Sequence, residues 1–166
     1  MVFIALYIKA DLENVTNLHA PAHHQWCLTV KQSDGSEERG PVFINEEEEH
    51  ELTGSKGTAH FILKWEGSKK ESYINVVRNM KGVTRPYCAE DSGKEVPIVV
   101  FECRGIEPIG WNPEGGYNCE SVEGARFEDI DLSDDWCEYD EKAQASLEIS
   151  NLTYSFKTIK EPKKGK

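Results

Sequence analysis

The sequence predicts an all-β fold in which two similar β-rich halves pack as one sandwich-like or barrel-like unit, with at most short helical turns. Most apolar segments have a strand length of roughly 5 to 10 residues and are separated by short polar turns. A weak internal repeat aligns residues 3–15 with residues 97–109, with Leu12 over Ile106. Helix-like material is confined to residues 133–145. Many short strands with few helices are typical of a β-sandwich or small barrel.

The first half is expected at residues 1–78 of a single domain that spans residues 1–166. Apolar alternation predicts strands over residues 2–10, 24–31, 41–45, 58–65 and 71–77. We expect residues 11–18 to be irregular and the acidic run at residues 46–51 to be a solvated loop. Trp26 is expected to face the core, and the Asp34-Gly35 pair predicts a tight turn.

The second half is expected at residues 97–159, after a polar connection at residues 78–96. Residues 98–101 are apolar on both faces of a predicted buried strand, which breaks at Gly105. Further strands are predicted at residues 125–132 and 146–159, with a β-bulge near Ser150 and Asn151 where the alternation changes phase. Ser133 is a candidate helix cap for residues 133–145. Residues 160–166 form a predicted disordered basic tail.

Composition limits the partners and the compartment. The net charge is -11, and an acidic surface repels nucleic acid phosphates and anionic lipid, so we expect neither nucleic acid nor a membrane as partner. No apolar stretch approaches a membrane span, and the N-terminus lacks the features of a signal peptide. Five widely spaced cysteines without a secretory signal indicate reduced thiols, and therefore a cytosolic or nuclear protein.

Several segments together resemble the eukaryotic CXXC-motif-containing zinc-binding proteins, small cytosolic proteins of uncharacterised activity. The segments that carry the resemblance are KADLENVTNL at 9–18, GSKGTAH at 54–60, FECRGIEP at 101–108, FEDIDL at 127–132, YDEKAQ at 139–144 and SNLT at 150–153. The resemblance implies a mostly β fold of two similar halves. It also implies a structural zinc ion held by two Cys-x-x-Cys knuckles in the first half.

This chain departs from the family pattern at all four zinc-ligand positions. The resemblance places the ligands where this sequence has Gln32, Gly35, Trp65 and Ser68. Structural zinc sites use thiolates and imidazoles, which none of these residues provides. We therefore predict that the protein holds no zinc there. Because structural zinc contributes on the order of 10 kcal/mol to such sites, its loss must be offset. The visible candidates are the Asp34-Gly35 turn and packing of the Trp65 indole.

Other sites for metal or nucleophilic chemistry receive less support from the sequence. His19, His23, His24 and Cys27 lie close in sequence, but they would converge on a metal only if the segment were helical. We expect exposed loop histidines and a buried Cys27 instead. Cys103 is a candidate nucleophile, because Arg104 beside it could lower the pKa of its thiol. The alternation of apolar residues favours Cys103 as a small core residue instead.

Two classes of function remain. The favoured one is a non-catalytic, cytosolic protein-binding module that uses the acidic segment 128–141 and the turn at residues 104–107. The residues of this candidate surface are Arg104, Glu107, Trp111, Asp129, Asp131, Trp136, Tyr139 and Asp140. The alternative is a small-ligand carrier or enzyme with a cleft between the halves near Arg104 and Glu107, lined by aromatic residues that include Tyr117. A deep cleft would favour the second class, and a shallow acidic face the first.

Overall fold

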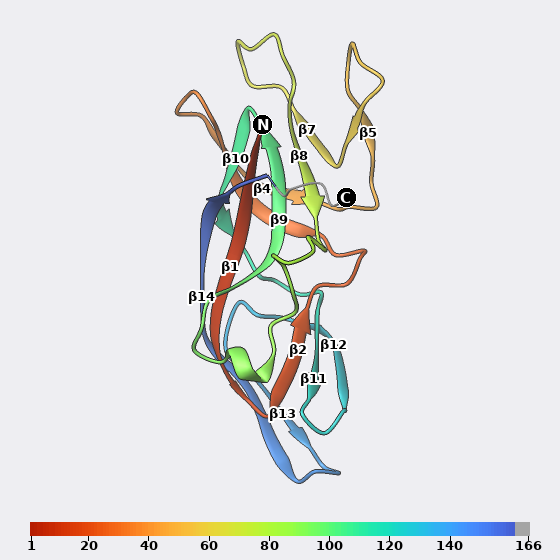
Figure 1. Cartoon of the computed structure of the whole chain (residues 1–166), viewed down its shortest axis with the longest axis vertical. Helices are drawn as coiled ribbons and strands as arrows, with labels where there is room; N and C mark the ends of the chain where they lie inside the picture. The colour runs from red at the N-terminus through yellow and green to blue at the C-terminus, as the bar shows by residue number, and fades with distance from the viewer. Residues whose placement is uncertain (162–166) are drawn as a thin grey trace.

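The protein is built almost entirely of antiparallel strands, as a computed structural model that describes residues 1–161 shows (Figure 1). Most of the predicted basic tail, residues 162–166, lies outside the described residues. The strands of the first half are β1 (Val2–Glu13), β2 (Val15–His19), β3 (Trp26–Gln32), β4 (Glu38–Ile44), β5 (His50–Glu51), β6 (Thr58–Ala59), β7 (Phe61–Leu63) and β8 (Ser72–Val77). Those of the second half are β9 (Val96–Arg104), β10 (Ile106–Trp111), β11 (Tyr117–Ser121), β12 (Arg126–Ile130), β13 (Trp136–Asp140) and β14 (Ala145–Ile159).

The strand order has an internal two-fold pattern. The large sheet runs β13-β14-β1-β9-β8-β7, so exchanging β1 with β9, β14 with β8 and β13 with β7 restores the same order. Two three-stranded sheets, β10-β3-β4 and β2-β11-β12, are related in the same way, by exchanging β2 with β10, β3 with β11 and β4 with β12. Each combines a hairpin of one half with a strand of the other half, which interlocks the two halves. The predicted all-β fold of two similar halves is confirmed.

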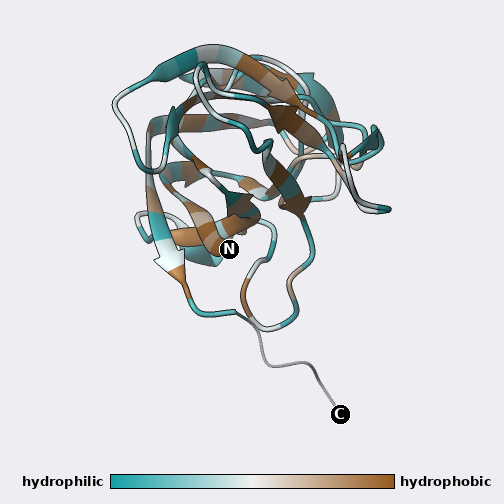
Figure 2. Ribbon diagram, turned by 90° about the horizontal axis from the view of Figure 1, so that it is seen from above, coloured by the Kyte–Doolittle hydropathy of each residue, from teal (hydrophilic) through white to brown (hydrophobic). Residues whose placement is uncertain are grey.

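The large sheet curls around a common interior, which makes the fold barrel-like (Figure 2). Its inner face supplies residues such as Leu6 and Phe101 to one core, which also contains Trp26 and Tyr117. Val100 points to the opposite face of the sheet and packs there with Phe3, Ala5 and Met80. Residues 98–101 are apolar on both faces because both faces of β9 are covered. The described residues contain no helix that is long and apolar enough to cross a membrane.

The structure also corrects the alignment of the repeat. β1 ends at Glu13 and β9 ends at Arg104, and the residue that follows each strand, Asn14 or Gly105, adopts positive φ before the next strand begins. Ile106 is therefore equivalent to Val15 and not to Leu12, as the sequence alignment had it. Residues 11–18 are not irregular, because β1 continues to Glu13 and β2 follows at once. The predicted bulge in the last strand is confirmed: the register of β14 against β1 shifts between Ser150 and Thr153.

The helix expected within residues 133–145 is wrong, because β13 occupies its middle. β13 pairs with β14 over Ala145–Ile149, and the Asp140 carboxylate accepts the backbone N–H of Lys142 in the tight turn that joins them. Ser133, the candidate helix cap, and the acidic residues Asp134 and Asp135 after it precede an edge strand instead. Within residues 1–161 the one helical element is a 3₁₀ turn, Ala89–Asp91.

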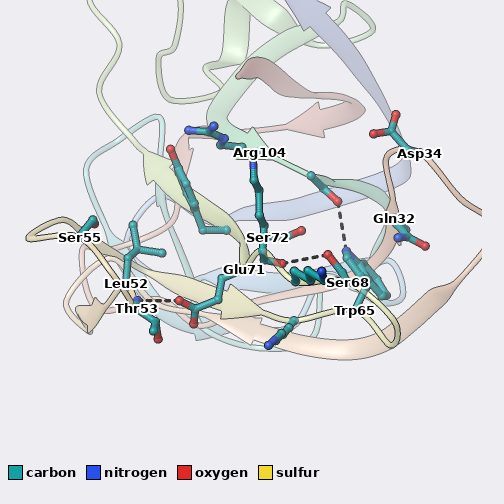
Figure 3. A pocket seen from close by; sticks show the side chains of 15 residues that line it. Gln32, Asp34, Leu52, Thr53, Ser55, Trp65, Ser68, Glu71, Ser72 and Arg104 are labelled. Carbon is teal, nitrogen blue, oxygen red and sulfur yellow. Dashed lines mark hydrogen bonds between the residues drawn. The ribbon is translucent and has the colours of Figure 1, made fainter.

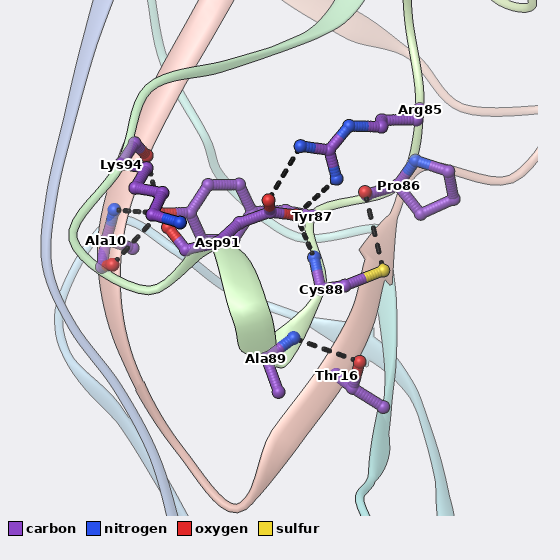
Figure 4. A network of polar contacts seen from close by, with 9 residues as sticks. All are labelled: Ala10, Thr16, Arg85, Pro86, Tyr87, Cys88, Ala89, Asp91 and Lys94. Carbon is purple, nitrogen blue, oxygen red and sulfur yellow. Dashed lines mark hydrogen bonds and ion pairs between the residues drawn. The ribbon is translucent and has the colours of Figure 1, made fainter.

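The connection between the halves is pinned to the sheet and is not a loose linker (Figure 4). Tyr87 is fully buried, and its hydroxyl lies 2.7 Å from the carbonyl oxygens of Asp91 and Lys94 and accepts the N–H of Ala10 in β1. The Arg85 guanidinium forms two 2.6 Å contacts with the buried Asp91 carboxylate, and this pairing holds the pKa of Asp91 below its usual value.

Candidate functional site

The two turns at residues 32–35 and 65–68, where the resemblance places the zinc ligands, lie together on one side of the fold. The first turn joins β3 to β4, and the Gly35 N–H donates to the Gln32 carbonyl across it. The Gln32 side chain folds over Gly35, so that a Cβ added at Gly35 would meet the Gln32 Oε1 atom. The second turn follows β7, and the Ser68 N–H donates to the Trp65 carbonyl at 3.0 Å. Both turns have the i to i+3 bond of a tight turn.

Trp65 forms the centre of this region. Its side chain is 2% exposed, and its indole N–H donates to the Gly105 carbonyl at 3.1 Å. The Ser33 N–H of the first turn donates to the same carbonyl at 3.2 Å. Gly105, at the break between β9 and β10, therefore joins the first turn and the Trp65 indole through one oxygen atom. The Arg39 guanidinium lies over the indole ring, 5.7 Å from its centroid.

A cavity of about 540 Å³ opens beside these turns (Figure 3). Gln32, Trp65 and Ser68 line it, together with Arg104 and Gly105 from the second half. Three of the four positions that the resemblance assigns to zinc thus face one hollow, although Gln32 lies more than thirty residues from Trp65 and Ser68 in sequence. Gly35 sits in the first turn but is not part of the lining.

The residues at these positions do not fit a zinc ion. They offer an amide, a hydroxyl and an indole N–H that already donates to Gly105, whereas structural zinc requires thiolates or imidazoles. Among residues 1–161 there is also no group of three or more His, Cys, Asp and Glu side chains that could hold a metal ion.

The histidines near residue 20 lie in three different environments. His19 is half-buried with Nδ1 2.8 Å from the Asn17 carbonyl oxygen, and His23 is exposed. His24, which we expected to be an exposed loop residue, is 4% exposed and packs against Trp26 and Tyr117. Burial lowers its pKa to about 4, so the ring is neutral near pH 7. The chain folds back here, since the His24 N–H donates to the Pro21 carbonyl.

Three of the cysteines are poor candidates for nucleophiles. Cys27, Cys103 and Cys119 are all buried, and burial raises the pKa of each thiol. The pKa of Cys103 is about 12, despite Arg104 beside it in the sequence. The thiolate form is therefore rare at neutral pH. Cys103 is a core residue, as the alternation indicated.

The candidate binding residues of the second half do not form one surface. Arg104 is exposed and lines the cavity beside the two turns, and Glu107 forms an ion pair with Lys31 at 3.0 Å. Trp111 is 5% exposed, and its indole donates to the Tyr117 hydroxyl at 3.0 Å, so the predicted aromatic-lined cleft is part of the core. β12 and β13 lie toward the end of the molecule opposite the β9–β10 turn (Figure 1).

The remaining candidate binding residues lie toward the β13 end of the molecule. Asp129 and Asp131 are exposed and accept hydrogen bonds from the Gly116 and Ser133 N–H groups. Trp136 is half-buried against Phe127, with ring centroids 5.4 Å apart. Asp140 is buried in its turn.

Tyr139 is 52% exposed on the outer edge of β13. Beside it lies a hollow of about 680 Å³ that is shallow and predominantly acidic. Its lining includes Glu123, Phe127, Tyr139, Asp140, Glu141 and Lys142. The sequence signal for this region was the run of acidic residues between 128 and 141, but the exposed strand edge appears only after folding.

Comparison with known proteins gives consistent matches along the chain. A family model described as "CXXC motif containing zinc binding protein, eukaryotic" matches residues 5–157. A human protein of the name "CXXC motif containing zinc binding protein" is 38% identical over 157 residues, which cover 92% of this chain and 96% of the human protein. A UPF0587 protein of Drosophila melanogaster is 36% identical over 165 residues, with 96% and 99% covered.

Two solved structures share the fold. The crystal structure of C1orf123 superimposes with a TM-score of 0.85 at 37% identity, covering 95% of this chain and 99% of that one. A hypothetical protein from Plasmodium falciparum superimposes with a TM-score of 0.88 at 32% identity, covering 95% and 100%.

Proposed function

This chain belongs to the eukaryotic family of CXXC motif containing zinc binding proteins, and we propose that it is a non-catalytic, cytosolic protein-binding module in which side-chain packing has replaced the zinc ion. The observation that carries the loss of zinc is the position of Trp65. Its indole stands at one of the four ligand positions, is buried, and donates a hydrogen bond to the Gly105 carbonyl, so packing and a hydrogen bond hold this turn in place of a metal bond. The indole N–H of Trp65 donates a hydrogen bond and has no lone pair for a metal ion, so Trp65 cannot act as a zinc ligand.

The zinc content of the purified protein tests this part of the proposal. Protein prepared without added metal is expected to contain far less than one zinc ion per chain in elemental analysis. The quadruple variant Gln32→Cys/Gly35→Cys/Trp65→Cys/Ser68→Cys is expected to bind one zinc ion, because the structure already places both turns beside one cavity. Replacing Gln32 also removes the side chain that a Cβ at Gly35 would meet. Cobalt substitution should show the absorption bands of tetrahedral thiolate coordination.

A matched control keeps the number of cysteines constant. The control variant Glu66→Cys/Lys81→Cys/Lys94→Cys/Glu123→Cys places four cysteines at exposed residues in separate segments, which do not supply the paired ligands of a zinc knuckle, so it should not form a tetrahedral site. Stoichiometric zinc in the unmodified protein would contradict the proposed loss. A quadruple variant that binds no cobalt would show that the turns do not preserve the knuckle geometry.

The protein-binding part is supported by the free edge of β13. β13 pairs with β14 on one side, and no described strand pairs with its other side. An unpaired edge can accept an extended peptide as an additional strand. Glu138 and Glu141 are exposed beside Tyr139, so this edge favours a basic partner and disfavours a second copy of the acidic chain. The raised thiol pKa values of the buried cysteines support a non-catalytic role.

A peptide of alternating lysine and valine is a direct probe of this edge. We expect it to shift the backbone amide resonances of residues 136–141 in a saturable way, and a glutamate-valine peptide to shift none of them. Tyr139→Ala should weaken binding about tenfold, since exposed aromatic side chains dominate such contacts. Phe43→Ala, which removes an aromatic side chain that is 57% exposed on β4, is the matched control and should not change the affinity. Shifts that map elsewhere, or equal effects of the two variants, would contradict this binding surface.

A further inference from the structure

The cavity beside the turns at residues 32–35 and 65–68 is lined by more basic than acidic side chains, although the whole chain carries a net charge of -11. Four segments of the fold supply its walls: the first turn, the loop at residues 52–55, the stretch from residue 64 to residue 73, and the β9–β10 break. The charged residues of the lining are the cations Lys64, Lys69, Lys70 and Arg104 and the carboxylates Asp34 and Glu71. Cations gathered around a hollow create a local positive potential there, although the protein as a whole is acidic.

The four cations have no carboxylate partner among residues 1–161. The ion pairs of the described structure involve other basic residues, such as Lys31 and Lys157. Of the two carboxylates in the lining, Glu71 is already used, because its Oε1 atom accepts the Thr53 N–H at 2.6 Å. Like charges that share one hollow repel each other, and an anion placed among them relieves that repulsion.

The remaining lining suits an organic molecule rather than a bare ion. Leu52 provides apolar surface, the buried Trp65 ring lies behind the wall, and the hydroxyl-bearing side chains of Thr53, Ser72 and Tyr73 belong to the same lining. Arg104 pairs with Tyr73 across β8 and β9, which fixes the backbone from which its guanidinium extends. A volume of about 540 Å³ lies within the usual range for small-molecule sites.

We propose that this cavity binds a small organic anion that carries at least two phosphate or carboxylate groups. Arg104 provides a planar fork of donors for one anionic group, and the lysines provide point charges for the other. The site is separate from the β13 edge and does not depend on the protein-binding proposal. It occupies the side of the fold where the resemblance places the zinc ion, so the cavity would serve a ligand where relatives are named for a metal.

Titration calorimetry with methylenediphosphonate and with citrate, at constant ionic strength and without divalent metal, tests this inference. We expect saturable binding of at least one of the two anions, and the anion that binds more tightly identifies the preferred anionic group. In NMR spectra the same anion should shift the backbone amide resonances of Ser68 and Gly105. The variant Arg104→Gln/Lys70→Gln should weaken binding about tenfold or more, because each lost charge-assisted contact is strong. Both residues are exposed, so the variant should fold normally.

The control variant Lys81→Gln/Lys94→Gln removes two exposed cations outside the cavity and changes the net charge equally. It should bind within about twofold of the unmodified protein, since neither lysine lines the cavity. Equal weakening in both variants would reduce the effect to overall charge and overturn the inference. Heats that do not saturate, or that sulfate reproduces at the same ionic strength, would also overturn it.

Discussion

Trp65→Ala is expected to lower the free energy of unfolding by about 3–5 kcal/mol, the usual cost of truncating a fully buried aromatic side chain. Trp65 is 2% exposed and belongs to the main core. Its removal also takes away the indole N–H that donates to Gly105, leaving that carbonyl with Ser33 as its partner. Denaturation in urea, followed by circular dichroism, measures the loss.

Two variants separate the contributions to this effect. Trp65→Phe keeps most of the buried ring but loses the hydrogen bond, so we expect it to cost about 1–2 kcal/mol. Trp136→Ala truncates a half-buried indole that packs on Phe127, and it should cost clearly less than Trp65→Ala. If Trp65→Ala costs no more than Trp136→Ala, the indole does not replace the stabilisation that zinc would provide.

The sequence predicts best where burial leaves a pattern along the chain. The run at residues 98–101 is apolar on both faces because β9 has a core on each side, and the change of phase near Ser150 marks a real bulge. The strand over Tyr117–Ser121 was not predicted. Its alternation of buried and half-buried residues includes Cys119 and Ser121, which are weak strand signals on their own.

Local signals fail where distant pairing decides the structure. Asp134 and Asp135 resemble the start of a helix, but pairing with β14 draws the following residues into a hairpin. His24 lies in a segment with turn residues that suggests exposure, yet Tyr117 and Trp26 enclose its ring. Neither outcome can be read from residues within a few positions of the site.

The candidate site was predictable only in part, for the same reason. The resemblance identified four positions, and the fold brings three of them to one cavity. The cations of that cavity come from the second turn and from the end of β9, which are far apart in sequence. By contrast, the predicted binding surface combined the turn at residues 104–107 with the acidic segment 128–141, but these two segments lie toward opposite ends of the molecule.

Gly105→Ala is expected to destabilise the protein by about 3 kcal/mol or more, because backbone strain and a steric clash act together. Gly105 has a φ of 75°, which disfavours any side chain, and a Cβ there would meet the Ser72 Oγ atom. Gly93→Ala is the matched control: φ is 79° and no atom lies within 4 Å of the added Cβ, so backbone strain alone should cost about 1 kcal/mol. Adding Ser72→Ala should recover part of the loss at Gly105 in urea denaturation. Equal losses of unfolding free energy in the two glycine variants would mean that the β9–β10 break can move away from β8. The Gly105 carbonyl would then not hold the turns at residues 32–35 and 65–68 in place.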